Sequence, residues 1–97
     1  ITGGFNVYPR NVEEAIQSHK SVKECAVVGV GDKHKGQLVK AYIVFEPGQE
    51  ISKDVLKNFL KDKLSKYEIP QEIEIIEELP KTMIGKISKK DLIKKDS

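Results

Sequence analysis

The chain contains 97 residues, of which 33% are charged and 38% are hydrophobic, and its formal net charge is +2. This length allows one small domain with a single core, but not a large enclosed active-site cavity. The low net charge argues against a strongly basic nucleic-acid-binding module, the lone cysteine rules out an internal disulfide, and no apolar run reaches the ~18 residues of a membrane-spanning helix.

The first expected element is a helix over residues 9–18. Pro9 suits the first helical position, where a missing backbone donor costs nothing. Val12, Ala15 and Ile16 then follow at helical spacing along one face. His19 is expected to end this helix as a partly buried structural residue, because no second histidine or carboxylate stands at metal-ligand spacing.

Two strands are expected next, over residues 22–30 and 38–45. Both are rich in β-branched residues, and the second places Val39, Ala41, Ile43 and Phe45 on one face. They predict an antiparallel hairpin, with Cys25 as a small buried residue of the first strand. His34 lies in the intervening loop, where a solvated turn histidine is favoured over a pH sensor or an anion ligand.

A second helix is expected after Ser52, a suitable N-cap residue. Its apolar stripe comprises Val55, Leu56, Phe59, Leu60 and Leu64. This stripe predicts core packing against the sheet rather than membrane binding, since it carries little apolar bulk. The residues around Pro70 end the helical region, and Ile73 and Ile75 alternate with glutamates in a third strand, whose acidic run to Glu78 suits the solvent face of a sheet edge.

The last segment, PKTMIGKISKKD, runs from Pro80 to Asp91. Pro80 fixes φ and Gly85 supplies a permissive backbone just before Lys86, so this lysine is expected at a tight, exposed turn. Ser88 is placed to cap a short helix over residues 89–95.

The order of these elements is helix, strand, strand, helix, strand, loop and short helix. It predicts an α+β fold, namely a small two-layer domain in which a mixed or antiparallel three-stranded sheet packs with helices. No internal repeat or linker divides residues 1–97, so they are expected to form one domain. The chain begins without methionine inside a motif, which suggests a portion of a longer protein.

Two motifs carry a resemblance to a known family. The string from Pro80 to Lys89 resembles the last motif of the adenylate-forming enzymes, a superfamily of acyl-CoA synthetases, adenylation domains of peptide synthetases and luciferases. The string GGFNVYPRNVEE, from Gly3 to Glu14, resembles the hinge-proximal motif of the same superfamily, in the wording typical of acyl-CoA synthetases. Two positions depart from the usual pattern: Lys89, where arginine is more frequent, and Asn11, where glutamate is common.

The resemblance implies that this is the mobile C-terminal domain of an acyl-CoA synthetase. Lys86 is then the catalytic lysine of the first step, in which a carboxylate and ATP give acyl-AMP and pyrophosphate. Lys81 and Gly85 are expected to contact the cofactor. In the second step the domain rotates, and Gly3 and Gly4 line the channel through which CoA reaches the acyl group.

The resemblance also implies partners and a location. The large N-terminal adenylation domain would hold ATP, the carboxylic acid, expected to be a fatty acid, and Mg²⁺, whose ligands would lie outside this chain. We therefore expect the isolated chain to be inactive. Acetylation of Lys86 would remove the charge that catalysis needs. A cytoplasmic location is expected from the reduced cysteine and the need for ATP and CoA.

Three other interpretations stay open at this point. The first is a nucleic-acid-binding module, suggested by six lysines against two aspartates after residue 79, although the IGKI string lacks a second glycine and no aromatic residues interleave with the basic run. The second is a non-catalytic interaction domain with a solvated lysine surface. The third is the C-terminal domain of another adenylate-forming enzyme.

Overall fold

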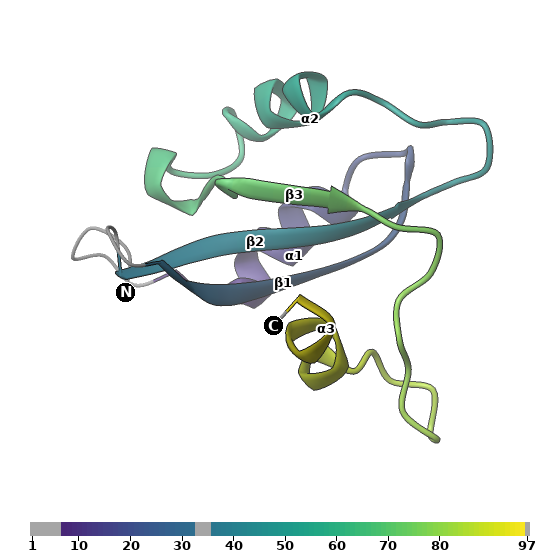
Figure 1. Ribbon diagram of the computed structural model, residues 1–97. Coiled ribbons are helices and arrows are strands. Elements are labelled where there is room, and N and C mark those ends of the chain that lie inside the picture. Colours follow the sequence, from purple (N-terminus) through teal and green to yellow (C-terminus); the bar gives the residue numbers. More distant parts are fainter. Residues whose placement is uncertain (1–6, 33–35, 97) are drawn as a thin grey trace.

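The computed structural model describes residues 7–32 and 36–96 of the chain. Its elements are α1 (Pro9–Gln17), β1 (Val22–Asp32), β2 (Gly36–Phe45), α2 (Lys53–Leu60), the 3-10 helix η1 (Lys66–Glu68), β3 (Glu72–Ile75) and α3 (Lys89–Asp96). Figure 1 shows these elements around a central sheet. The predicted α+β class and the predicted element order are both confirmed.

The sheet has the strand order β1-β2-β3 and is mixed. Strands β1 and β2 form the expected antiparallel hairpin, whereas β3 runs parallel to β2, with Ala41 opposite Ile73. A register shift between Val22 and Glu24 marks a β-bulge. A bulge inserts one residue into one strand, and here it lets Val22 join the same core as Cys25 while Glu24 keeps the other face of the sheet.

Helices α1 and α2 cover the first face of this sheet. Val12 and Ile16 of α1 and Leu56 and Leu60 of α2 are completely buried against the strands. Their spacing of four residues places each pair on one side of its helix. Ser52 caps α2 as predicted, because its Oγ accepts a hydrogen bond from the Val55 amide at 3.1 Å.

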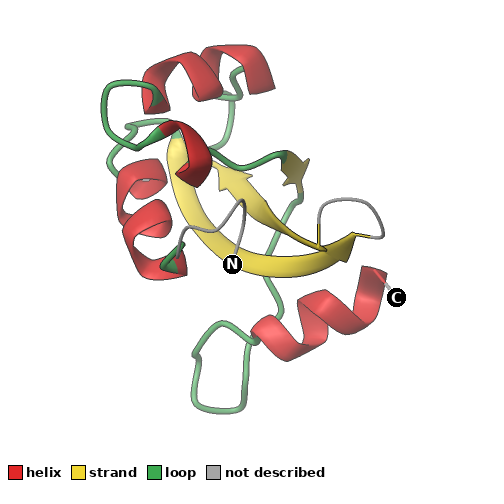
Figure 2. Cartoon of the chain, turned by 90° about the vertical axis from the view of Figure 1, so that its left-hand side faces the viewer, coloured by secondary structure: helices red, strands yellow, loops and turns green. Residues whose placement is uncertain are grey.

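Helix α3 adds a layer on the second face. Leu92 of α3 and Leu79 of the preceding segment pack with Ala26 of β1 and with Tyr42 and Val44 of β2. Figure 2 shows the helix beside the C-terminus on the opposite side of the sheet from the other helices. This second core places the segment between β3 and α3 against the sheet.

Three local predictions need correction or refinement. Val55 was expected in the buried stripe of α2 but is 52% exposed, because its position is turned away from the side that carries Leu56 and Leu60. Helix α2 ends at Leu60, so Leu64 lies beyond the helix, but its side chain still packs against the same core as Leu56 and Leu60. Strand β3 is an edge strand as expected, but it ends at Ile75, so residues 76–78 of the acidic run lie beyond it.

Candidate functional site

The segment that carries Lys86 is a small hairpin. Lys81 and Ile87 form an antiparallel bridge, and the Ser88 amide donates to the Pro80 carbonyl oxygen at 2.8 Å. Gly85 has a φ of +85°, a conformation that side-chain-bearing residues rarely adopt. The expected tight turn at Gly85 is therefore confirmed, and Figure 1 shows this loop projecting from the body of the molecule between β3 and α3.

Thr82 fixes the main chain of Lys86. Its amide donates to the Lys86 carbonyl oxygen at 2.7 Å, and its Oγ1 accepts from the Lys86 amide at 3.3 Å. Lys86 itself is exposed, and its ammonium group has no hydrogen-bond or ion-pair partner among residues 7–32 and 36–96. The hairpin therefore presents a cation on a fixed backbone.

The tip of the hairpin is apolar. Met83 and Ile84 precede Gly85 and are 105% and 78% exposed. Below the tip, Leu79 is buried and Ile87 packs against the second core. The base of the hairpin is thus held in the core while its tip projects into solvent.

Ion pairs hold both ends of the hairpin. Lys81 bonds to Glu24 of β1, and Lys89 Nζ lies 2.8 Å from Glu13 Oε2 of α1. The bridged part of the hairpin begins at Lys81, and α3 begins at Lys89. Ser88 caps α3 as predicted, since its Oγ accepts from the Asp91 amide at 3.3 Å.

The structure places the predicted site residues unevenly. Lys81, Gly85 and Lys86 lie together on the hairpin, but Lys81 is paired with Glu24. Gly3, Gly4 and His34 lie outside the described residues. Sequence reasoning missed Glu13 and Glu24, because the contacts that distinguish them join positions far apart in the chain.

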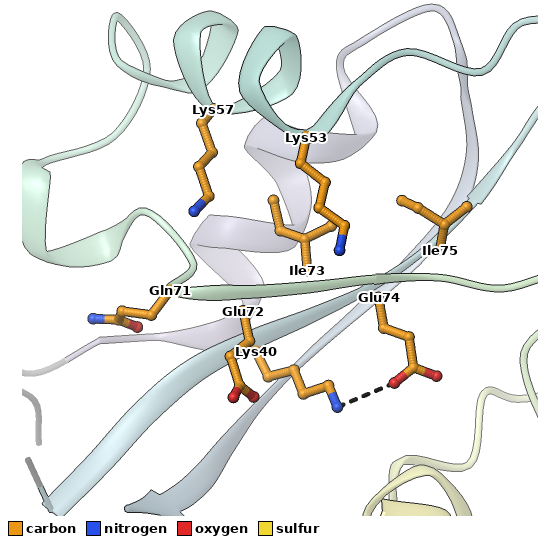
Figure 3. A pocket seen from close by; sticks show the side chains of 8 residues that line it. All are labelled: Lys40, Lys53, Lys57, Gln71, Glu72, Ile73, Glu74 and Ile75. Carbon is orange, nitrogen blue, oxygen red and sulfur yellow. Dashed lines mark hydrogen bonds and ion pairs between the residues drawn. The ribbon is translucent and has the colours of Figure 1, made fainter. Parts of the chain in front are cut away.

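A groove of about 650 Å³ lies between α2 and the edge strand β3 (Figure 3). Its walls are formed by Lys40, Lys53, Lys57 and residues 71–75. The Lys40 ammonium pairs with the Glu74 carboxylate at 3.2 Å. In Figure 1 helix α2, which forms one side of this groove, lies at the top of the view, and the loop between β3 and α3 projects at the bottom. The groove is therefore separate from the hairpin.

Burial raises the pKa of the Cys25 thiol to about 12, with a smaller contribution from the Glu13 carboxylate and an opposing one from Lys89. A thiol with so high a pKa is protonated at neutral pH and is a poor nucleophile. Within the described residues no group of three or more His, Cys, Asp or Glu side chains could hold a metal ion, and no helix there has the length and apolarity to cross a membrane.

The family model "AMP-binding enzyme C-terminal domain" matches residues 11–86 of the chain, a span that includes most of α1, the whole sheet and the hairpin up to its exposed lysine. The chain belongs to this family. The chain is 39% identical over 97 residues to the Long-chain-fatty-acid–CoA ligase of Bacillus subtilis (strain 168), covering 100% of the chain and 17% of that protein. It is 45% identical over 92 residues to the 2-succinylbenzoate–CoA ligase of Lactococcus lactis subsp. lactis (strain IL1403), covering 95% of the chain and 20% of that protein.

Solved structures also resemble the chain closely. ATP-bound MatB from Rhodopseudomonas palustris matches with a TM-score of 0.92 and 34% identity, over 98% of the chain and 19% of that structure. The amide bond synthetase McbA from Marinactinospora thermotolerans matches with a TM-score of 0.91 and 32% identity, over 97% of the chain and 19% of that structure. The chain therefore spans about a fifth of the length of these relatives, and the predicted family resemblance is confirmed.

Proposed function

We propose that this AMP-binding C-terminal domain serves an acyl-CoA ligase and supplies Lys86 for the adenylation step. The observation that carries the proposal is the hairpin, which fixes the Lys86 backbone through Thr82 and leaves its ammonium group exposed and without a partner among the described residues. Ligases that act on carboxylic acids are among the relatives that share its sequence.

The chemistry of adenylation explains why an exposed lysine is useful. A carboxylate attacks the α-phosphate of ATP and pyrophosphate leaves, so two anions must approach each other and negative charge develops during the transfer. An ammonium group between them offsets this repulsion, and a lysine supplies a compact charge on a flexible stem. Removal of Lys86 should cost on the order of 2–4 kcal/mol of transition-state stabilisation, or roughly 10²–10³ in rate.

The remaining parts of the proposal concern the second step and the partner domain. Rotation of the domain withdraws Lys86, and the segment that contains Gly3 and Gly4 then lines the channel for the CoA thiol, since glycine leaves room for a thin ligand near the backbone. The N-terminal adenylation domain holds ATP, Mg²⁺ and the carboxylic acid, which we propose to be a fatty acid. The need for ATP and CoA, together with an unpaired thiol, supports a cytoplasmic location.

One relative points to a second possible acceptor of the acyl group. McbA is named an amide bond synthetase, so a close structural relative of this domain serves an enzyme named for a product other than a thioester. We favour CoA as the acceptor because the curated relatives described above are CoA ligases. An assay that offers either CoA or an amine to the acyl-adenylate distinguishes the two acceptors.

The decisive test compares the full-length enzyme with its Lys86→Ala variant in carboxylate-dependent ATP–pyrophosphate exchange. Thioester formation from preformed acyl-adenylate serves as the second measurement, and Lys53→Ala, an exposed lysine on α2, is the matched control. We expect Lys86→Ala to lose exchange while it retains thioester formation, and Lys53→Ala to retain both. Equal exchange in Lys86→Ala and wild type would favour a non-catalytic interaction domain.

A further inference from the structure

Two carboxylates outside the hairpin hold its two ends. Glu24 lies on β1 and bonds to Lys81, which begins the bridged part of the hairpin. Glu13 lies on α1 and bonds to Lys89, which begins α3. Lys86 stands between these two lysines, five residues after the first and three before the second. Its position relative to the sheet therefore depends on both contacts.

Glu13 makes the more constrained of the two contacts. Its Oε2 atom accepts the Val27 amide at 2.8 Å and the Lys89 ammonium at 2.8 Å, so one oxygen joins three elements. Val27 lies on β1, which is an edge strand, so its hydrogen bond fixes the Glu13 carboxylate at the edge of the sheet. The Glu13 side chain is only 24% exposed, which limits the freedom of this carboxylate to follow a moving partner.

The expected effect of these contacts is on geometry more than on stability. The side chains of Lys81 and Lys89 are 40% and 42% exposed, and ion pairs of that kind contribute little to folding. A displacement of ~1 Å at a reacting group can nevertheless lower a rate by about 10²-fold. The loss of a weak ion pair at either end of the hairpin can thus displace Lys86 and lower the rate of adenylation strongly.

We propose that Glu13 and Glu24 are positioning residues for adenylation, which set the place and direction of the Lys86 hairpin by binding Lys89 and Lys81. The inference rests on the proposed role of Lys86 and extends it to residues that the family resemblance did not indicate. It also gives Lys81 a role through Glu24 rather than through contact with the cofactor.

The test uses the full-length enzyme and measures both half-reactions for Glu13→Gln and Glu24→Gln. Glutamine at position 13 keeps an oxygen that can accept from Val27 but removes the charge that faces Lys89. Lys89→Met removes the same ion pair and leaves the bond between Glu13 and Val27 intact, which keeps the test valid if Glu13→Gln folds poorly. Glu14→Gln is the matched control on α1, because Glu14 pairs with Arg10 on the exposed side of the helix, at 3.7 Å.

We expect Glu13→Gln, Lys89→Met and Glu24→Gln each to lower the kcat of pyrophosphate exchange about tenfold or more, as a misplaced group would. The KM for ATP and the rate of thioester formation should stay at the wild-type values, and Glu14→Gln should match wild type in every measurement. The exchange of charges in Glu24→Lys with Lys81→Glu should restore part of the lost exchange, since the pair is re-formed in reverse.

Three results would overturn the positioning role alone, and a fourth would refute the proposed function on which it rests. Equal losses in both half-reactions would show that these residues only maintain the fold. Wild-type exchange in the Glu13 and Glu24 variants, beside a defective Lys86→Ala enzyme, would leave the proposed function intact and remove the positioning role. Lys81→Met is measured beside Glu24→Gln: a silent Glu24→Gln with a defective Lys81→Met would show that Lys81 acts without Glu24, by contacting the ligand directly. Wild-type exchange in Lys86→Ala would refute the proposed function itself.

Discussion

Thr82 makes two hydrogen bonds to the main chain of Lys86, one with its carbonyl oxygen and one with its amide. The first contact is made by the Thr82 backbone and survives any substitution except proline. The second is made by the Thr82 side chain and can be removed alone. This division allows the contribution of backbone order at Lys86 to be measured without changing the lysine.

We predict that Thr82→Val lowers pyrophosphate exchange by up to about tenfold in the full-length enzyme, since one hydrogen bond contributes ~0.5–1.5 kcal/mol. Valine has nearly the shape of threonine but has no oxygen to accept the Lys86 amide. Thr82→Ser keeps that oxygen and should retain most of the activity. If the valine and serine variants exchange at the same rate, the hydroxyl contact has no part in presenting Lys86.

Gly85 and Gly48 provide a matched pair for testing the turn. Both have positive φ, +85° and +74°, and an added Cβ would meet no atom within 4 Å at either position. Alanine at each should therefore destabilise the chain by a similar ~1–2 kcal/mol, through backbone strain alone. Denaturant unfolding measures this cost.

Only Gly85→Ala should also impair adenylation, because Gly85 adjoins Lys86 while Gly48 lies in the turn after β2. The comparison of pyrophosphate exchange in the two full-length variants separates a local effect on the hairpin from general destabilisation. Equal exchange in both variants would mean that the turn conformation at Gly85 does not matter for Lys86.

The sequence predicted features that depend on local chemistry. The caps at Ser52 and Ser88, the hairpin of β1 and β2 and the turn at Gly85 follow from residue types within a few positions of each other, and the structure has all four. Contacts between distant residues were not predicted. Glu24 is 57 residues from Lys81, and no periodicity or spacing connects two surface charges so far apart.

The same reasoning explains why the second core was missed. Leu79 follows two glutamates and Leu92 lies in a lysine-rich helix, and only the path of the chain across the sheet brings them to Tyr42. Val55 shows the opposite error. It lies beside Leu56 in sequence, yet one step along a helix turns a side chain by about 100°, and Val55 faces solvent.

Val55 and Leu56 give a direct test of that assignment. We predict that Leu56→Ala lowers the free energy of unfolding by about 2–5 kcal/mol, because Leu56 is completely buried and its loss leaves a cavity. Val55→Ala should change it by no more than about 0.5 kcal/mol, as expected for an exposed position. Urea denaturation measures both values. A large loss in Val55→Ala would place Val55 in the core, as the sequence pattern first indicated.

Cys25 lies on β1 beside Glu13 of α1, and the burial of its thiol allows a prediction about its reactivity. Its Sγ lies 3.5 Å from the Glu13 carbonyl oxygen, and burial raises its pKa to about 12. We predict that iodoacetamide modifies Cys25 slowly in the folded protein at pH 8 and rapidly in denaturant, as measured by mass spectrometry of the peptide that contains it. Rapid modification of the folded protein would contradict a buried, protonated thiol.

The raised pKa also determines how stability changes with pH. Between pH 9 and about 12 an unfolded Cys25 has lost its proton while a folded one keeps it, so the unfolded state binds fewer protons and the free energy of unfolding falls as pH rises. The slope from this group is at most ~1.4 kcal/mol per pH unit. The difference in unfolding free energy between wild type and Cys25→Ala isolates it from the lysines, which titrate in both proteins. This difference should be constant below pH 9 and decrease above it, and a constant difference throughout would mean that the Cys25 thiol has the same pKa in the folded and unfolded states.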